Sequence, residues 1–317
     1  MTRRFRLLLS GWVAACFALF AASAFAQADP AAVRAVPVAA SAPTTAPADE
    51  ILPGPAVEDD DEAEEFHPPA ATHVWLRFAP GAWRRSVVTT QSLSPDGETL
   101  AVGVTTRDET LASAELDRYV LQSRATVTTL GRVIEGQWVD ASYSALFDGP
   151  GNLVAQQRLD DEAMVIDGQN VNCAVWQLQY DDGGRRMSDQ VWFSAEVFPH
   201  VLMRHRLTLA DDPTAAPDRM ETVEVVAGAL PYHFGEDLLT CACVRTTREG
   251  PKGRTVEIAL LSETTPGGQV IAWSTEWDAE GRRVRTTVAE TVEFGTEPVD
   301  RSLLPRRQLR QQRRAAR

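Results

Sequence analysis

The sequence predicts an all-β protein, an antiparallel meander of about twelve strands that forms a strongly curved sheet, a half-barrel or two packed sheets. From residue 72 onward, Thr, Val, Trp and Leu alternate with polar residues in short runs, with the period of a β-strand. Turn signals rich in Gly, Asp and Pro separate these runs. Sequence marks also recur about 68 residues apart, which indicates an internal duplication.

The chain begins with a predicted secretory signal peptide, residues 1–26. Three arginines within the first six residues precede an apolar run over residues 7–25. Ala24 and Ala26 supply the small residues that a signal peptidase needs at −3 and −1. We therefore expect an exported protein whose mature chain begins at Gln27, in the periplasm or the medium.

Three other interpretations of this start stay open. The apolar run is just long enough to be a membrane anchor. Thr2-Arg3-Arg4 is similar to a twin-arginine export signal. Val13-Ala14-Ala15-Cys16 is similar to a lipobox, which would make Cys16 the lipid-bearing N-terminus of a lipoprotein.

Charged segments flank the folded part. Residues 27–72 are rich in Ala and Pro and include an acidic run, 58–65, with seven carboxylates in eight positions. Such a composition predicts a disordered linker. Residues 301–317 carry seven Arg and no acid, and we expect a second disordered segment that suits contacts with anionic envelope polymers.

The charge balance excludes one class of partner. Without the three arginines of the signal peptide, 28 basic residues face 44 acidic ones, so the mature chain has a net charge of −16. A body this acidic repels nucleic acid, and we expect none to bind the folded part.

The mature chain has three cysteines, Cys173, Cys241 and Cys243, and can form at most one disulfide within itself. In a continuous meander Cys173 and Cys241 lie four strands apart, about 19 Å, whereas a disulfide needs Cα atoms within about 7 Å. The Cys-Ala-Cys pair lacks the spacing, second pair and nearby His of a metal site. We expect three buried thiols, without a disulfide or a metal.

The duplication organises the predicted body. Cys173-Ala174 recurs as Cys241-Ala242, and Glu221-Thr222-Val223-Glu224 recurs as Glu290-Thr291-Val292-Glu293. Between these marks, the segment 194–199 has its counterpart at 262–266. We predict an N-terminal β region over 73–165, a first copy over 166–228 and a second copy over 229–300.

Each copy is predicted to contain four strands. They cover 171–180, 187–195, 200–209 and 220–227 in the first copy, and 239–247, 254–262, 269–277 and 283–294 in the second. In the N-terminal region we predict a hairpin over 83–111, further strands within 131–147 and 153–165, and one short helix over Asp108–Leu116.

Six tryptophans fall within predicted strands: Trp83, Trp138, Trp176, Trp192, Trp273 and Trp277. Aromatic side chains that face inward would build the core. In the alternative interpretation, they line a groove for lipid or glycan.

A resemblance covers about residues 81–210. Gly81-x-Trp83, "VVTTQSLSPDGETLAVGVTTRDETL" and "DGQNVNCAVWQLQYDDGGRRMSDQVWFSAEVFPHVLMRH" resemble uncharacterised exported bacterial proteins with a β-rich domain. The second half is similar to their pattern G-x-x-V-x-C … W-x-S-x-x-V-P, with Phe198 inserted before the proline. Such domains are similar to the periplasmic lipoprotein-carrier superfamily, in which a curved antiparallel sheet forms an incomplete barrel. The resemblance implies a fold and assigns no ligand-contacting residue.

No motif predicts a catalytic site. His200 and His205 are five residues apart and would lie on opposite faces of a strand, which does not suit one metal. His73 and His233 are isolated, and the acid pairs 160–161 and 211–212 lie at predicted turns. The chain has no Gly-x-Ser-x-Gly elbow, phosphate loop or His-Glu-x-x-His motif. We expect no catalytic residue, cofactor or metal, and leave the ligand-binding residues unassigned.

These observations predict an exported cell-envelope binding or scaffolding protein that holds an apolar or envelope-derived ligand in the concavity of its sheet. Two alternatives remain: a purely structural interaction protein tethered by its charged ends, and a hydrolase with an unrecognised site. An apolar cavity would favour the first interpretation, a filled core the second, and convergent titratable residues in a cleft the third.

Overall fold

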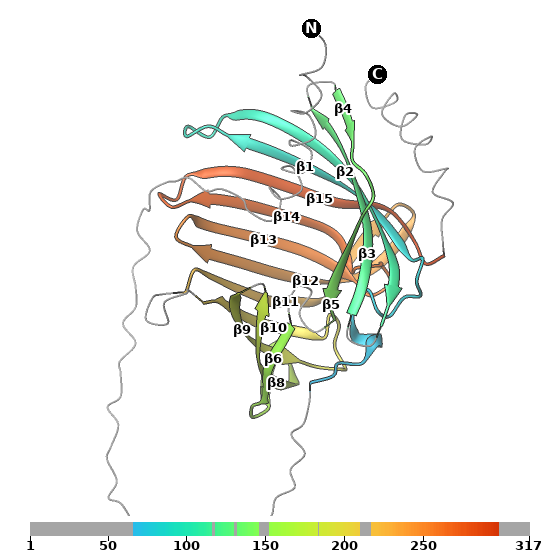
Figure 1. Ribbon diagram of the computed structural model, residues 1–317, viewed down its shortest axis with the longest axis vertical. Coiled ribbons are helices and arrows are strands. Elements are labelled where there is room, and N and C mark those ends of the chain that lie inside the picture. The colour runs from blue at the N-terminus through green and yellow to red at the C-terminus, as the bar shows by residue number, and fades with distance from the viewer. Residues whose placement is uncertain are drawn as a thin grey trace, which may run out of the picture.

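The computed structural model describes residues 66–115, 118–129, 132–145, 152–182, 184–209 and 217–297. These residues form one large antiparallel sheet of fifteen strands that is not closed into a barrel (Figure 1). The all-β prediction is therefore confirmed. The predicted signal peptide, the acidic run and the basic tail lie outside the described residues.

The first strands along the chain are β1 (Trp83–Leu93), β2 (Thr99–Ala114), β3 (Arg118–Thr129), β4 (Arg132–Glu135), β5 (Val139–Ser144), β6 (Asn152–Arg158) and β7 (Glu162–Ile166). The remaining strands are β8 (Gln169–Asp182), β9 (Arg185–Phe193), β10 (Val201–Thr208), β11 (Arg219–Phe234), β12 (Asp237–Gly250), β13 (Gly253–Ser262), β14 (Gln269–Asp278) and β15 (Arg283–Gly295). A short 3-10 helix, Ala70–Thr72, precedes them.

The strand order is β4-β3-β2-β1-β15-β14-β13-β12-β11-β10-β9-β8-β6, with β5 on β3 and β7 on β8. From β8 to β15 every strand pairs with the next one along the chain, so this half is the predicted meander. The last strand, β15, also pairs with β1, and this contact joins the N-terminal region to the end of the sheet. Figure 1 shows β1 and β12–β15 side by side as a broad curved layer.

The eight strands predicted for the two copies correspond to β8–β15. The turns predicted after residues 94, 181, 265 and 278 also connect consecutive strands. The loop from Ser194 to His200 and the loop from Ser262 to Gly268, which lie 68 residues apart, have matching backbone bonds. The Ser194 N–H donates to the His200 carbonyl over 2.8 Å, and the Ser262 N–H donates to the Gly268 carbonyl over 2.7 Å. Such equivalence is what a duplication requires, and the duplication itself stays a prediction.

The helix predicted over Asp108–Leu116 is wrong, because residues as far as Ala114 belong to β2. This part of β2 pairs with β1 on one side and β3 on the other, and this pairing overrides the local helix propensity. The strand β3 was not predicted, and the count of about twelve strands was correspondingly low.

Residues 66–78 cross one face of the sheet, which we call the inner face. Phe66 packs on Trp176 and Phe193, with ring centroids 5.1 and 5.6 Å away. At the other end of this strap, Trp75 joins a core cluster with Leu111. The fold therefore begins at least seven residues inside the segment 27–72 that composition predicts to be a linker.

A third cluster connects the first strands of the meander to its middle. It includes Val175 and Trp192 from β8 and β9, and Val225 and Val244 from β11 and β12. The long β11–β12 hairpin also reaches the end of β15, where Phe234 lies 5.0 Å from Phe294 between ring centroids. These contacts curve the sheet and leave the opposite ends of β12–β15 uncovered by the described residues.

Candidate functional site

The inner face carries a row of charged residues across seven strands. Cross-strand neighbours along this row are Asp189, Arg206, Glu221, Arg248, Thr255, Glu276 and Arg285, from β9 to β15. Directly opposite residues of an antiparallel pair share one face and lie close enough for their side chains to interact. The row therefore alternates in charge from Asp189 to Arg248 and, beyond the neutral Thr255, ends in the pair Glu276 and Arg285.

The pairs in this row are tight. Arg206 donates from Nε and Nη2 to the two carboxylate oxygens of Asp189 over 2.8 and 2.7 Å, and Asp189 is fully buried. Glu221 accepts from Arg248 over 2.6 Å and from Arg204 over 3.3 Å. Although burial by itself would raise the pKa of Glu221, Arg248 and Arg204 lower it to about 2.

Glu257 stands next to this row on the inner face, between Thr246 and Ser274 of the neighbouring strands. Within the described residues it has no hydrogen bond or ion pair. Burial raises its pKa, and the attraction of Arg248 does not offset this effect. The described inner face thus combines a packed strap with a charged network.

The outer face, on the opposite side of the same strands, presents two tryptophans from β14. Trp273 and Trp277 are four residues apart, so both project from this face, roughly 13 Å apart along the strand. The Trp273 residue is 42% exposed. Its cross-strand neighbours are Ile258 and Val288. A large aromatic surface is therefore presented to solvent on an ordered strand.

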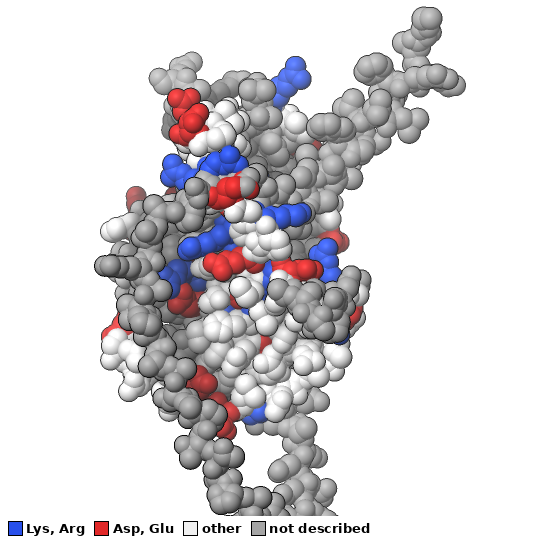
Figure 2. All heavy atoms as spheres, turned by 90° about the vertical axis from the view of Figure 1, so that its left-hand side faces the viewer, with Lys and Arg blue, Asp and Glu red and all other residues white. Residues whose placement is uncertain are grey.

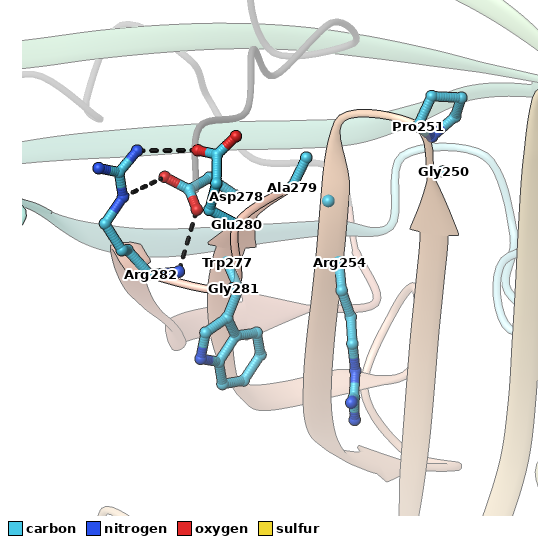
Figure 3. Close-up of a pocket in the computed structure, with 10 residues that line it drawn as sticks. Gly250, Pro251, Arg254, Trp277, Asp278, Ala279, Glu280, Gly281 and Arg282 are labelled. Carbon is cyan, nitrogen blue, oxygen red and sulfur yellow. Dashed lines mark hydrogen bonds and ion pairs between the residues drawn. The ribbon is translucent and has the colours of Figure 1, made fainter. Parts of the chain in front are cut away.

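Trp277 borders a groove at the ends of the hairpins (Figure 3). The groove has a volume of about 1110 Å³ and lies between the β12–β13 turn and the β14–β15 turn. Its lining residues are Gly250, Pro251, Gly253, Arg254, Trp277, Asp278, Ala279, Glu280, Gly281 and Arg282. In Figure 3, Arg254 and Trp277 project to the same side of their neighbouring strands.

The wall of the groove is held by one buried carboxylate. Asp278 accepts from the backbone N–H of Arg282 over 3.0 Å and from its Nε over 3.2 Å. Arg282 also donates to Glu280 over 2.9 Å. The β14–β15 turn is thereby ordered, and its charges are paired among themselves.

The opposite wall carries a cation beside the aromatic ring. The Arg254 guanidinium carbon lies 5.7 Å from the centre of the Trp277 ring, within the range of a cation–π contact. Figure 2 looks at the side of the molecule on which these hairpin turns lie. It shows basic and acidic side chains intermixed there, not a field of one sign.

The predicted site residues fall in different places. His200 is buried at the end of its loop, where its Nδ1 lies 3.1 Å from the Ser194 carbonyl. His205 is exposed and lies edge-on to Trp192. The acid pair 160–161 lies in a loop, and 211–212 lies outside the described residues. In the described part of the chain, no group of His, Cys, Asp and Glu residues is arranged to hold a metal ion.

The three thiols are free, with Cys173 and Cys241 buried and Cys243 half-buried. Cys173 lies in β8 and Cys241 in β12, four positions apart in the sheet as the meander required. Burial raises the pKa of each thiol. These are the features of core cysteines, not of a reactive site.

Four of the six tryptophans form two groups, and Trp83 is half-buried at the start of β1. Trp176 and Trp192 are buried in core clusters, whereas Trp273 and Trp277 belong to the outer face. Trp138 is not within a strand, because it precedes β5.

The groove could not be predicted from the sequence, because its two turns are 25 residues or more apart along the chain. The spacing of Trp273 and Trp277 was the available signal for a shared face.

Comparisons with known proteins leave the family open. No family model and no curated protein matches the chain. A solved structure that it resembles is that of a "putative exported protein with YmcC-like fold" from Bacteroides fragilis NCTC 9343. The identity is 9% and the TM-score 0.29, over 69% of this chain and 97% of that one. A TM-score this low carries no argument about function, and nothing here supports the lipoprotein-carrier superfamily. None of the helices within the described residues is long and apolar enough to cross a membrane.

Proposed function

We propose that this chain is an exported cell-envelope module that binds a glycan on the outer face of β13–β15. The observation that carries the proposal is the pair Trp273 and Trp277, held on one face of β14 with the second ring beside a groove. The C–H faces of sugar rings pack on aromatic rings, while sugar hydroxyls exchange hydrogen bonds with neighbouring polar side chains.

The residues around the rings favour a sugar over a protein partner. Between the two tryptophans, the next row across the sheet contains Val256, Thr275, Thr286 and Gln91. A protein-binding face has a contiguous, largely apolar centre that loses its water on binding. Here Thr275 separates the two aromatic rings along β14, and Thr275, Thr286 and Gln91 provide donors and acceptors for a hydroxylated ligand, beside the apolar Val256, Ile258 and Val288.

The remaining parts of the chain suit this role. The signal-like start implies export, and the basic segment 301–317 would add a second, electrostatic attachment to anionic envelope polymers. The inner face, with its strap and ion-pair network, would serve as the rigid support for the outer face.

The test is native gel electrophoresis of the mature chain in gels that contain soluble polysaccharides, including those extracted from the source cell's own envelope. We expect at least one polysaccharide to retard the wild type. Trp273→Ala and Trp277→Ala should each weaken retardation about fivefold, because the loss of one stacked aromatic ring costs roughly 1 kcal/mol.

Trp138→Ala is the matched control. Trp138 also lies under an arginine, with the Arg124 guanidinium carbon 5.0 Å from its ring, but it lies at the β3 end of the sheet. The control should bind as the wild type does. Equal retardation of the wild type and both β14 variants, or retardation by no polysaccharide, would overturn the proposal.

A further inference from the structure

We infer that the glycan is anionic, a polysaccharide of uronate type, and that Arg254 and Arg283 hold its carboxylate while the sugar ring stacks on Trp277. This inference rests on the proposed function and names the chemical class of its ligand. It depends on how the three residues are placed across β13, β14 and β15.

Trp277 has an arginine as its direct neighbour on each side. Arg254 is its partner in β13 and Arg283 is its partner in β15. Directly paired residues project from the same face of a sheet, with Cα atoms about 5 Å apart. The pairing of β14 with β15 shifts by one residue between Glu276 and Trp277, so Val284 and Arg283 both oppose Trp277 across a β-bulge. Arg254 therefore shares the face of the Trp277 ring, and the bulge places Arg283 opposite Trp277 on the neighbouring strand.

The two arginines are available to a ligand. Arg283 is exposed and has no hydrogen bond or ion pair within the described residues. Arg254 is 56% exposed, and its contact with Glu249 is long, 3.8 Å, between two exposed side chains. Such a surface pair is weak and is exchanged at little cost for a ligand carboxylate. Guanidinium groups are suited to carboxylates because they donate two parallel hydrogen bonds.

The two acids of the neighbouring turn are held away from Arg254 and Arg283 by a third arginine, which balances one of their two charges. Asp278 and Glu280 are both engaged by Arg282 in the β14–β15 turn. The exposed Lys252, in the β12–β13 turn, adds a further cation at the same end of the sheet. Charges of both signs lie on this side of the molecule, and the cations next to the ring, Arg254 and Arg283, are complementary to the carboxylate of an acidic sugar.

The experiment compares two charged probes with a neutral one, again by retardation in native gels. Sodium alginate and polygalacturonate are the uronate probes, and dextran is the neutral probe. We expect retardation by a uronate polymer, little by dextran, and a decrease when salt is raised to screen the arginines. Arg283→Gln and Arg254→Gln should each weaken uronate binding about fivefold or more. Arg245→Gln, which changes an exposed outer-face arginine paired with Glu224, should not.

The outcomes separate this inference from the proposed function. Binding of dextran as strong as that of alginate, sensitive to Trp277→Ala but not to Arg283→Gln, would overturn the inference and keep a glycan-binding face. Alginate binding that persists unchanged in Trp277→Ala and Arg283→Gln alike would place the polyanion on the basic tail and overturn the inference. Because these side chains are exposed, unchanged thermal melts should show that each variant is folded.

Discussion

The charged row on the inner face makes Glu221 the residue whose ionisation should matter most for stability. Its carboxylate accepts from Arg248 and Arg204, and its side chain is only 10% exposed. The arginines lower its pKa from the ordinary 4.5 to about 2, against the opposing effect of burial. We expect Glu221→Gln to destabilise the protein at neutral pH, because it leaves two guanidinium groups without their carboxylate.

The size of the effect follows from the pKa. A fall from 4.5 to about 2 corresponds to roughly 3 kcal/mol of stabilisation, at about 1.4 kcal/mol per pH unit. Because the folded pKa is the lower one, this stabilisation is complete well above pH 4.5 and is lost as the pH falls toward 2. At pH 3, about 2 kcal/mol of it should already be lost.

Urea unfolding followed by tryptophan fluorescence measures this directly. Glu221→Gln should be less stable than the wild type by roughly 3 kcal/mol at pH 7 and by only about 1 kcal/mol at pH 3. Glu290→Gln, which changes an exposed carboxylate, should differ from the wild type by less than about 0.5 kcal/mol at both pH values. A stability difference for Glu221→Gln that is the same at pH 7 and pH 3 would refute the reasoning.

Two further substitutions test the packing of the sheet. Glu257→Gln should raise the urea midpoint at pH 7 but not at pH 4. Burial raises the pKa of Glu257 more than Arg248 lowers it, so the ionised carboxylate destabilises the fold as the pH rises. A variant that is less stable than the wild type at pH 7 would contradict this prediction. Gly267→Ala should cost more than 2 kcal/mol, because φ is +73° and a Cβ would lie 2.7 Å from the Trp75 ring. Gly97→Ala is the matched control, because Gly97 has φ +83° but open space around it, and this substitution should cost only about 1 kcal/mol. If thermal melts showed the same loss of stability for both variants, the Trp75 ring would have no role in the effect.

The local pattern of the sequence was sufficient for the meander. Alternation of apolar and polar residues has a period of two wherever a strand forms, and a tight hairpin needs Gly or Asx at its corners. For this reason the strands β8–β15 and several of their turns could be predicted. The separation of Cys173 from Cys241 followed from the order of strands alone.

Local pattern could not decide the region from Asp108 to Leu116. Asp108 is buried between Arg85 and Arg124, which come from strands on its two sides, and Leu111 is buried beneath the strap. Both faces of β2 are therefore covered here, so the alternation that marks a half-exposed strand is lost. Only the pairing with β1 and β3 makes this segment a strand.

The candidate site was decided by tertiary structure for a related reason. The period of two in a strand predicts that Trp273 and Trp277 share a face. It does not predict which face of the sheet is covered by the strap and which is exposed to solvent, because both faces carry apolar residues. Arg254 and Arg283 become neighbours of Trp277 through cross-strand register, which the one-dimensional sequence does not contain. The sequence by itself thus determined the strands β8–β15 and the signal-like start of the chain. The choice of faces and the assembly of the groove depend on long-range pairing, and only the folded sheet could decide them.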